Sequence, residues 1–175
     1  MAVFCSDEQS DIGIDLERWS RLARLVLDDE RAPVDAEVSL LFVDEPSIAD
    51  LNGRFLGGDG PTDVLAFPID DDHVPSGRRP DEGGRGPGSS NEPVDPPIVL
   101  GDVVLCPVVA RRQATEHDWS LDDELSLLVV HGLLHLLQYD HAEAEETERM
   151  QRRERELLER FRELEPPAGA PGTPT

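Results

Sequence analysis

Residues 121–141 read LDDELSLLVVHGLLHLLQYDH, and this stretch decides how the rest of the chain is interpreted. Up to position 137 it is strongly apolar. Ser120 followed by Asp123 is typical of a helix N-cap with an acid at the third helical position. The stretch therefore predicts a buried helix over 121–137.

Three histidines share this stretch. His131 and His135 are four residues apart, so both imidazoles project from one face of the predicted helix, one turn apart. His141 follows six residues later, where the chain can turn back towards the pair. Three neutral imidazoles with one open position are typical of a catalytic zinc site. We therefore expect one metal ion at these residues, preferably zinc, with nickel, copper or iron as alternatives.

The offsets of four and ten between the histidines equal those of the metzincin peptidase pattern H-E-x-x-H-x-x-G-x-x-H. Gly132 replaces the glutamate that acts as general base in those enzymes, which disfavours proteolysis by their mechanism. Gln138 stands where that pattern has a glycine at a turn. A left-handed backbone there would cost glutamine about 1 kcal/mol.

Two carboxylates are close to the histidines in sequence. Asp140 is a candidate for orienting a ligand histidine or accepting a proton from metal-bound water, or it is simply a residue of the helix end. Glu124 lies seven residues before His131 on the same helix face, and we expect a solvated first-turn acid rather than support for a ligand. We assign no role to the remaining histidines, His73 and His117.

Hydrophobic periodicity, caps and breakers predict the other elements. We expect helices at 16–27 (capped by Asp15), 46–55 (with Pro46 in its first position), 107–117 and 142–164, and strands at 38–43, 62–67 and 98–105. Residues 71–97 hold six prolines and five glycines, which predicts a disordered insert. It is either a tolerated insertion or a substrate-touching loop that uses Arg78, Arg79 and Arg85. We expect one domain over 1–165 and a flexible tail at 166–175.

The chain of 175 residues has 38 acidic and 16 basic side chains, all 16 of them arginine, for a net charge of −22. This balance disfavours generic, charge-driven binding to nucleic acid. Two distant cysteines exclude a disulfide scaffold and a thiolate zinc finger and suit a reducing cytoplasm. No apolar run approaches the roughly 20 residues of a spanning helix, and the N-terminus does not resemble a secretory signal.

Three segments resemble the YbeY family of bacterial zinc-dependent, single-strand-specific endoribonucleases. Residues 131–141 resemble its H-G-x-L-H-L-x-G-Y-D-H signature. Residues 60–68, GPTDVLAFP, are similar to its P-T-D-V-L-S-F-P segment, and residues 100–106, LGDVVLC, resemble its L-G-D-I-x-I/L-C strand. Leu51-Asn52 matches the start of a helix motif of the family. The likeness runs from about position 38 to 164.

The resemblance implies an α/β (α+β) fold, a small mixed four-stranded sheet packed with about five helices, and a zincin-like three-histidine metal site. It implies one Zn²⁺ per chain, held by His131, His135 and His141. The implied role is cytoplasmic: maturation of the 3′ end of 16S rRNA and late ribosome quality control. The implied partners are single-stranded rRNA and the ribosomal small subunit, with an assembly GTPase or a ribosomal protein, and no membrane.

Two family positions differ. The first is Gln138, where the family usually has a glycine. Many members carry an arginine directly after the aromatic residue of that helix motif, whereas here Leu56 follows Phe55 and the nearest arginine is Arg54. We take Arg54 and Asp140 as candidate catalytic residues. The alternatives are a non-catalytic, zinc-stabilised ribosome assembly factor and, less favoured, a metallopeptidase.

The charge of the chain limits how it can hold RNA. A broad basic surface is excluded, so binding must come from the zinc charge, from a few arginines such as Arg54, Arg111 and Arg112, and from a ribosomal partner that presents the strand. We expect weak, salt-sensitive binding to free RNA.

Overall fold

The computed structural model describes residues 1–69, 97–139 and 143–165. Its elements are β1 (Ala2–Asp7), α1 (Leu16–Asp29), β2 (Ala36–Phe42), α2 (Glu45–Leu51), the π-helical turn η1 (Asn52–Leu56), β3 (Val64–Pro68), β4 (Ile98–Leu105), α3 (Pro107–His117), α4 (Leu121–Leu136) and α5 (Ala144–Leu164). The predicted insert at 71–97, apart from Pro97, and the predicted tail at 166–175 lie outside the described residues.

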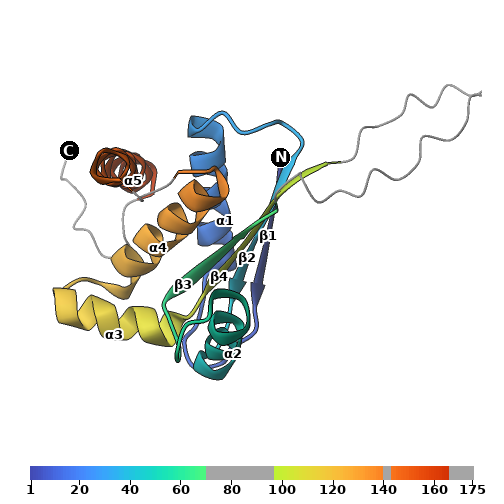
Figure 1. Ribbon diagram of the computed structural model, residues 1–175. Helices are drawn as coiled ribbons and strands as arrows, with labels where there is room; N and C mark the ends of the chain where they lie inside the picture. The colour runs from blue at the N-terminus through green and yellow to red at the C-terminus, as the bar shows by residue number, and fades with distance from the viewer. Residues whose placement is uncertain (70–96, 140–142, 166–175) are drawn as a thin grey trace, which may run out of the picture.

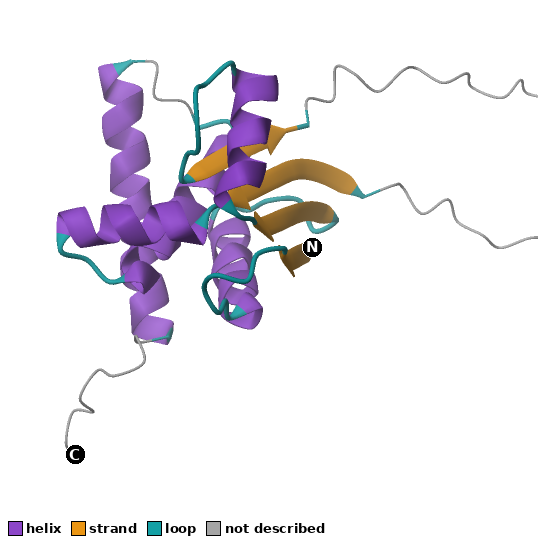
Figure 2. Ribbon diagram, turned by 90° about the horizontal axis from the view of Figure 1, so that it is seen from below, coloured by secondary structure: helices purple, strands orange, loops and turns teal. Residues whose placement is uncertain are grey.

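The strands form one mixed sheet in the order β1-β2-β4-β3. Strands β1, β2 and β4 are parallel, and β3 is antiparallel to β4. Helices α1 and α4 lie along one face of the sheet, and α5 packs on the far side of that helical layer (Figure 1). Figure 2 shows the same layers from below. The predicted α/β fold, a mixed four-stranded sheet with five helices, is confirmed.

The central strands contact a core on each face of the sheet, and one face is more deeply buried than the other. On β2, Val38, Leu40 and Phe42 point into the larger core under α1 and α4. On β4, Val104 points to the opposite face, where it joins Ile48 of α2 in a smaller core. Where consecutive residues are buried, at Val103, Val104 and Leu105 of β4, the sequence is apolar without interruption, whereas the half-buried face of β2 carries Glu37 and Ser39.

Strand β4 contains a bulge at its third residue, Leu100. Glu37 of β2 pairs with Val99 and the next residue, Val38, pairs with Gly101, so Leu100 is an extra residue in β4. Gly101 has φ +135°, and a Cβ there would lie 2.1 Å from the carbonyl oxygen of Phe67. Only glycine fits this close approach of β3.

Two elements differ from the sequence-based expectation. The helix predicted over 46–55 begins at Glu45 and ends at Leu51, and the chain continues as the π-helical turn η1. Asn52 helps to close this segment, because its side-chain amide donates to the carbonyl oxygen of Gly60 at 3.0 Å. Strand β1 was not predicted; it is a half-exposed edge strand without a regular alternation of buried residues, so its sequence carries little strand signal.

The predicted helix caps are present. The Asp15 side chain accepts from the backbone N–H of Arg18 at 3.1 Å, and the Ser120 hydroxyl accepts from the backbone N–H of Asp123 at 3.0 Å. These bonds satisfy N–H groups that have no partner inside α1 and α4. Both helices start within a residue of the predicted position.

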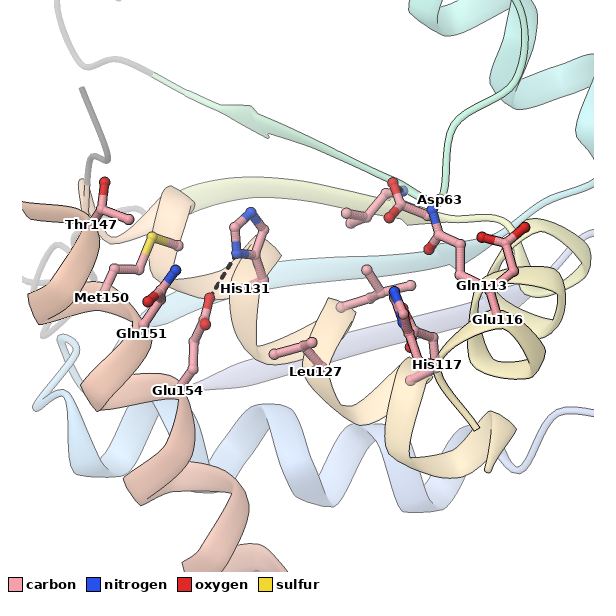
Figure 3. A pocket seen from close by; sticks show the side chains of 13 residues that line it. Asp63, Gln113, Glu116, His117, Leu127, His131, Thr147, Met150, Gln151 and Glu154 are labelled. Atoms are coloured by element: carbon pink, nitrogen blue, oxygen red, sulfur yellow. Dashed lines mark hydrogen bonds and ion pairs between the residues drawn. The ribbon is translucent and has the colours of Figure 1, made fainter. Parts of the chain in front are cut away.

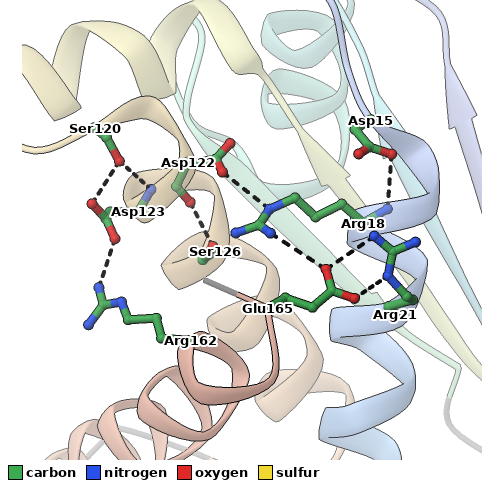
Figure 4. A network of polar contacts seen from close by, with 9 residues as sticks. All are labelled: Asp15, Arg18, Arg21, Ser120, Asp122, Asp123, Ser126, Arg162 and Glu165. Atoms are coloured by element: carbon green, nitrogen blue, oxygen red, sulfur yellow. Dashed lines mark hydrogen bonds and ion pairs between the residues drawn. The ribbon is translucent and has the colours of Figure 1, made fainter. Parts of the chain in front are cut away.

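A charged network ties the ends of three helices together (Figure 4). Arg18 of α1 lies 3.2 Å from the Asp122 carboxylate of α4 and 3.5 Å from that of Glu165, which follows α5. Arg21 also binds Glu165. None of the helices in the described ranges is long and apolar enough to cross a membrane.

Helix α4 contacts the sheet closely at Gly132. A Cβ at this position would lie 2.5 Å from Cγ1 of Val103 in β4. The neighbour is a short, β-branched side chain that cannot swing away. The glycine therefore allows α4 to lie directly on β4, and no larger side chain fits there.

We predict that Gly132→Ala destabilises the protein by about 1–3 kcal/mol, because the added methyl group overpacks the contact. Its effect on helix propensity alone would be stabilising by about 1 kcal/mol. Denaturant unfolding measures the difference. Gly13→Ala is the control, since no atom lies within 4 Å of the added Cβ. An equal free energy of unfolding for Gly132→Ala and wild type would contradict the close packing of Gly132 against Val103.

Candidate metal centre

His131 and His135 meet at the exposed side of the last two turns of α4. Their Nε2 atoms are 3.1 Å apart, and the ring planes are inclined by 79°. Two imidazole ligands of one tetrahedral zinc ion, with Zn–N bonds of about 2.0–2.1 Å, have nitrogens about 3.3 Å apart. The two ring nitrogens therefore converge as a shared metal ion requires, and the residues present fit such an ion.

Glu154 of α5 supports this pair from the other side. Its Oε1 atom lies 2.7 Å from Nδ1 of His131, and the residue is only 8% exposed. An Nδ1–H that donates to this carboxylate leaves the Nε2 lone pair directed towards His135. A carboxylate behind a histidine is the usual support for a metal-binding imidazole.

Sequence-based reasoning assigned this supporting role to Asp140 and did not find Glu154. A signal was present in α5. Glu154 lies on the same face as Met150, Leu157 and Phe161, which are buried, so an acid interrupts an apolar stripe at helical spacing. A buried acid on such a stripe needs a partner, and His131 is that partner.

Asp140 and His141 lie outside the described residues. No group of three histidine, cysteine, aspartate or glutamate side chains that could hold a metal occurs within 1–69, 97–139 and 143–165. Of the three predicted ligands, the described part of the chain thus contains His131 and His135, which it brings together.

The chain leaves α4 through a left-handed residue. Gln138 has φ +64°, its N–H donates to the carbonyl of His135 at 3.0 Å, and the N–H of Tyr139 donates to that of Leu134 at 2.9 Å. Glutamine thus adopts the left-handed backbone conformation that was considered for this position because the metzincin pattern has a glycine there. The Tyr139 hydroxyl donates to Glu30 of α1 at 2.8 Å. Burial, together with the Glu30 carboxylate, raises the pKa of Tyr139.

A pocket of about 810 Å³ opens beside the histidines, between β3, α3, α4 and α5. His131 and Glu154 lie at one end, and Asp63, Gln113, Glu116 and His117 gather at the other, with Leu127 between them (Figure 3). The lining is completed by Val64, Glu124, Leu128, Thr147, Met150 and Gln151.

The expectation that Glu124 is a solvated acid is wrong. The residue is 3% exposed and lines the pocket, because the first turn of α4 packs against the end of α3. Its Oε2 atom lies 3.5 Å from Nδ1 of His117, to which no role was assigned. Its position in the first helical turn suggested that Glu124 is exposed to solvent. The residue is buried because it lies on the same helix face as His131, which lines the pocket.

Arg54 lies in η1, 3.2 Å from Asp50, with its guanidinium 5.5 Å from the ring centre of Phe55. It is not among the residues that line the pocket. Arg111 and Arg112 are exposed on α3, and Arg112 pairs with Glu45. A catalytic role of Arg54 stays a prediction.

Residues 4–162 match the sequence model of the family described as Endoribonuclease YbeY. The chain belongs to the YbeY endoribonuclease family. It is similar to Endoribonuclease YbeY of Thermobifida fusca, with 46% identity over 154 residues that cover 88% of this chain and 90% of the relative. The corresponding protein of Frankia casuarinae is 45% identical over 158 residues, which cover 90% and 73%.

The solution structure of TM1509 from Thermotoga maritima has the same fold, with a TM-score of 0.56, 23% identity, and coverage of 98% of this chain and 99% of that one. The predicted resemblance is confirmed, and the YbeY match extends further towards the N-terminus than the 38–164 that the motifs indicated. As a member of the YbeY family, the chain is a hydrolase whose substrate is RNA.

We predict that Glu154→Gln lowers the affinity for zinc by about ten- to a hundredfold, because the neutral amide supports the His131 imidazole less well than a carboxylate does. Competition with a chromogenic chelator measures the affinity. Glu148→Gln, an exposed acid on the same helix, is the matched control and should leave it unchanged. Equal zinc affinity of the two variants would contradict the role of Glu154 in supporting the metal-binding His131.

Proposed function

We propose that the chain is a zinc-dependent endoribonuclease that hydrolyses single-stranded RNA at a zincin-like site formed by His131, His135 and His141. The observation that carries this proposal is the convergence of the two Nε2 atoms at 3.1 Å, with the Glu154 carboxylate behind His131, in a chain of the YbeY family. One ion per chain is expected, with His141 as the third ligand.

When bound, zinc supplies a lowered pKa for a coordinated water and polarises a phosphoryl oxygen. The chain contributes the rest. The Nε2 atoms of His131 and His135 would hold the ion, and Glu154 would keep the proton of His131 on Nδ1. We assign to Asp140, next to His141, the acceptance of a proton from the attacking water. We assign to Arg54, exposed on η1, a contact with the RNA backbone outside the pocket.

The proposed substrate is rRNA in the cytoplasm, at the maturing 3′ end of 16S rRNA and in late ribosome quality control. A net charge of −22 supports a substrate that is presented by the ribosomal small subunit, with a ribosomal protein or an assembly GTPase, rather than captured from solution. The four carboxylates that line the pocket add to the electrostatic repulsion between the chain and RNA phosphates. We expect binding to free RNA to be weak and to fall further with salt.

The metallopeptidase alternative is disfavoured by packing. A glutamate at position 132 would have to occupy the space of Val103, so α4 has no room for the general base of a metzincin. The assembly-factor alternative is favoured by Leu56, which stands in place of the usual arginine and is 60% exposed next to the equally exposed Phe55. This apolar pair suits contact with a protein more than with phosphates.

We predict that His135→Ala abolishes zinc retention and RNA cleavage together, because one of the two converging nitrogens is removed. Cleavage of a single-stranded RNA oligonucleotide, with and without chelator, and metal content are measured on the same samples. His73→Ala is the control and should behave as wild type. Full cleavage by a metal-free His135→Ala protein would contradict the proposal.

Casein and RNA, offered in parallel with and without chelator, separate the peptidase from the nuclease. Normal ribosome maturation in cells that carry a zinc-binding but cleavage-dead variant would favour the assembly factor.

A further inference from the structure

The end of the pocket opposite the histidines has its own chemistry. Glu124 is 97% buried, and its Oε2 atom has no hydrogen-bond partner among the described residues. The polar atom recorded nearest to it, Nδ1 of His117, is 3.5 Å away, too far for a normal hydrogen bond. The side chain lines the pocket, so its buried carboxylate borders the space that a ligand would enter. Buried acceptors are nearly always satisfied, which indicates a ligand with donors.

We propose that this end of the pocket is a nucleobase subsite in which the Glu124 carboxylate accepts hydrogen bonds from the N1–H and N2–H₂ groups of a guanine in the RNA substrate. The proposal deepens the endoribonuclease function and rests on it, because it assumes that the phosphate to be cleaved lies at the histidine end.

The spacing along α4 fits one nucleotide. Glu124 lies seven residues before His131 on the same face, which is about 10 Å along a helix. This length is comparable with that of a nucleotide from its phosphate to the far edge of its base. A phosphate beside His131 therefore places an adjacent base at Glu124, and it keeps the negative phosphate away from the negative carboxylate.

The walls between the two ends suit a flat, aromatic ligand. Leu127 and Leu128 line the middle of the pocket, and in Figure 3 Leu127 lies between His131 and His117. The rings of His117 and Trp119 are in contact, with centroids 5.3 Å apart. Of the two, His117 lines this pocket, and aromatic side chains in RNA sites typically stack on bases.

Guanine matches a carboxylate better than the other bases do. A carboxylate has two acceptor oxygens, and the Watson–Crick edge of guanine alone presents two adjacent donors. Adenine and cytosine present a ring acceptor next to their amino group, and uracil presents one N–H between two carbonyls, so each turns an acceptor towards the carboxylate. A cation is the weaker candidate, since the described residues contain no group of three metal-binding side chains there.

The test uses single-stranded RNA oligonucleotides that differ at one position, which holds guanine, inosine or adenine. Inosine lacks only the N2 amino group. We expect wild-type enzyme to cleave beside guanine with kcat/KM about tenfold or more above the other two. Glu124→Gln should reduce this preference to about twofold or less, since the amide replaces one acceptor by a donor. Glu148→Gln, an exposed acid that does not line the pocket, is the control and should keep the preference.

Binding supplies a readout that does not depend on cleavage. Calorimetry should show tighter binding of guanosine 5′-monophosphate than of inosine 5′-monophosphate to wild type, and equal binding to Glu124→Gln. If Glu124→Gln does not fold, the difference between guanine and inosine in binding and cleavage by the wild-type protein tests the subsite on its own. Cleavage with no difference between guanine and inosine would overturn the subsite while leaving the nuclease intact. A guanine preference in binding without cleavage would overturn the nuclease instead.

Discussion

Helix α4 lies so close to β4 that position 132 has no space for a side chain, and the geometry of the site depends on this contact. The backbone of Gly132 rests on Val103 at the centre of the sheet. Since this contact fixes the rotation of the helix, His131 lines the pocket, and Glu124 does so two turns earlier. The same glycine that allows the approach leaves no place for a metzincin-type base. The packing against Val103 therefore requires glycine at position 132, and that same glycine removes the general base that a metzincin peptidase needs.

The sequence predicts well those elements whose signals are local. The caps at Asp15 and Ser120, the apolar period of α1 and α4, and the left-handed residue at Gln138 all follow from short-range chemistry. What it did not predict depends on distant partners. Strand β1 is defined by pairing with β2, and Glu154 matters because α5 returns to His131 from 23 positions further along the chain. Glu124 looked exposed in the sequence because its first-turn position does not reveal that α3 packs against it.

The pocket combines two kinds of chemistry under an unfavourable overall charge. At one end two imidazoles converge and are backed by a buried carboxylate, an arrangement suited to a cation and through it to a phosphate. At the other end the carboxylates of Asp63, Glu116 and Glu124 favour hydrogen-bond donors. A chain with a net charge of −22 can discriminate against most nucleic acid by repulsion and admit a strand only where both ends are satisfied. Specificity would then come from the pocket and from a presenting partner rather than from a basic surface.

All of this depends on a metal ion at the converging histidines. The metal content of the purified protein, measured by inductively coupled plasma mass spectrometry after dialysis against zinc and then against metal-free buffer, tests that point most directly. The geometry predicts one zinc ion per chain. A protein that keeps no zinc, nickel, copper or iron after this treatment would contradict the account.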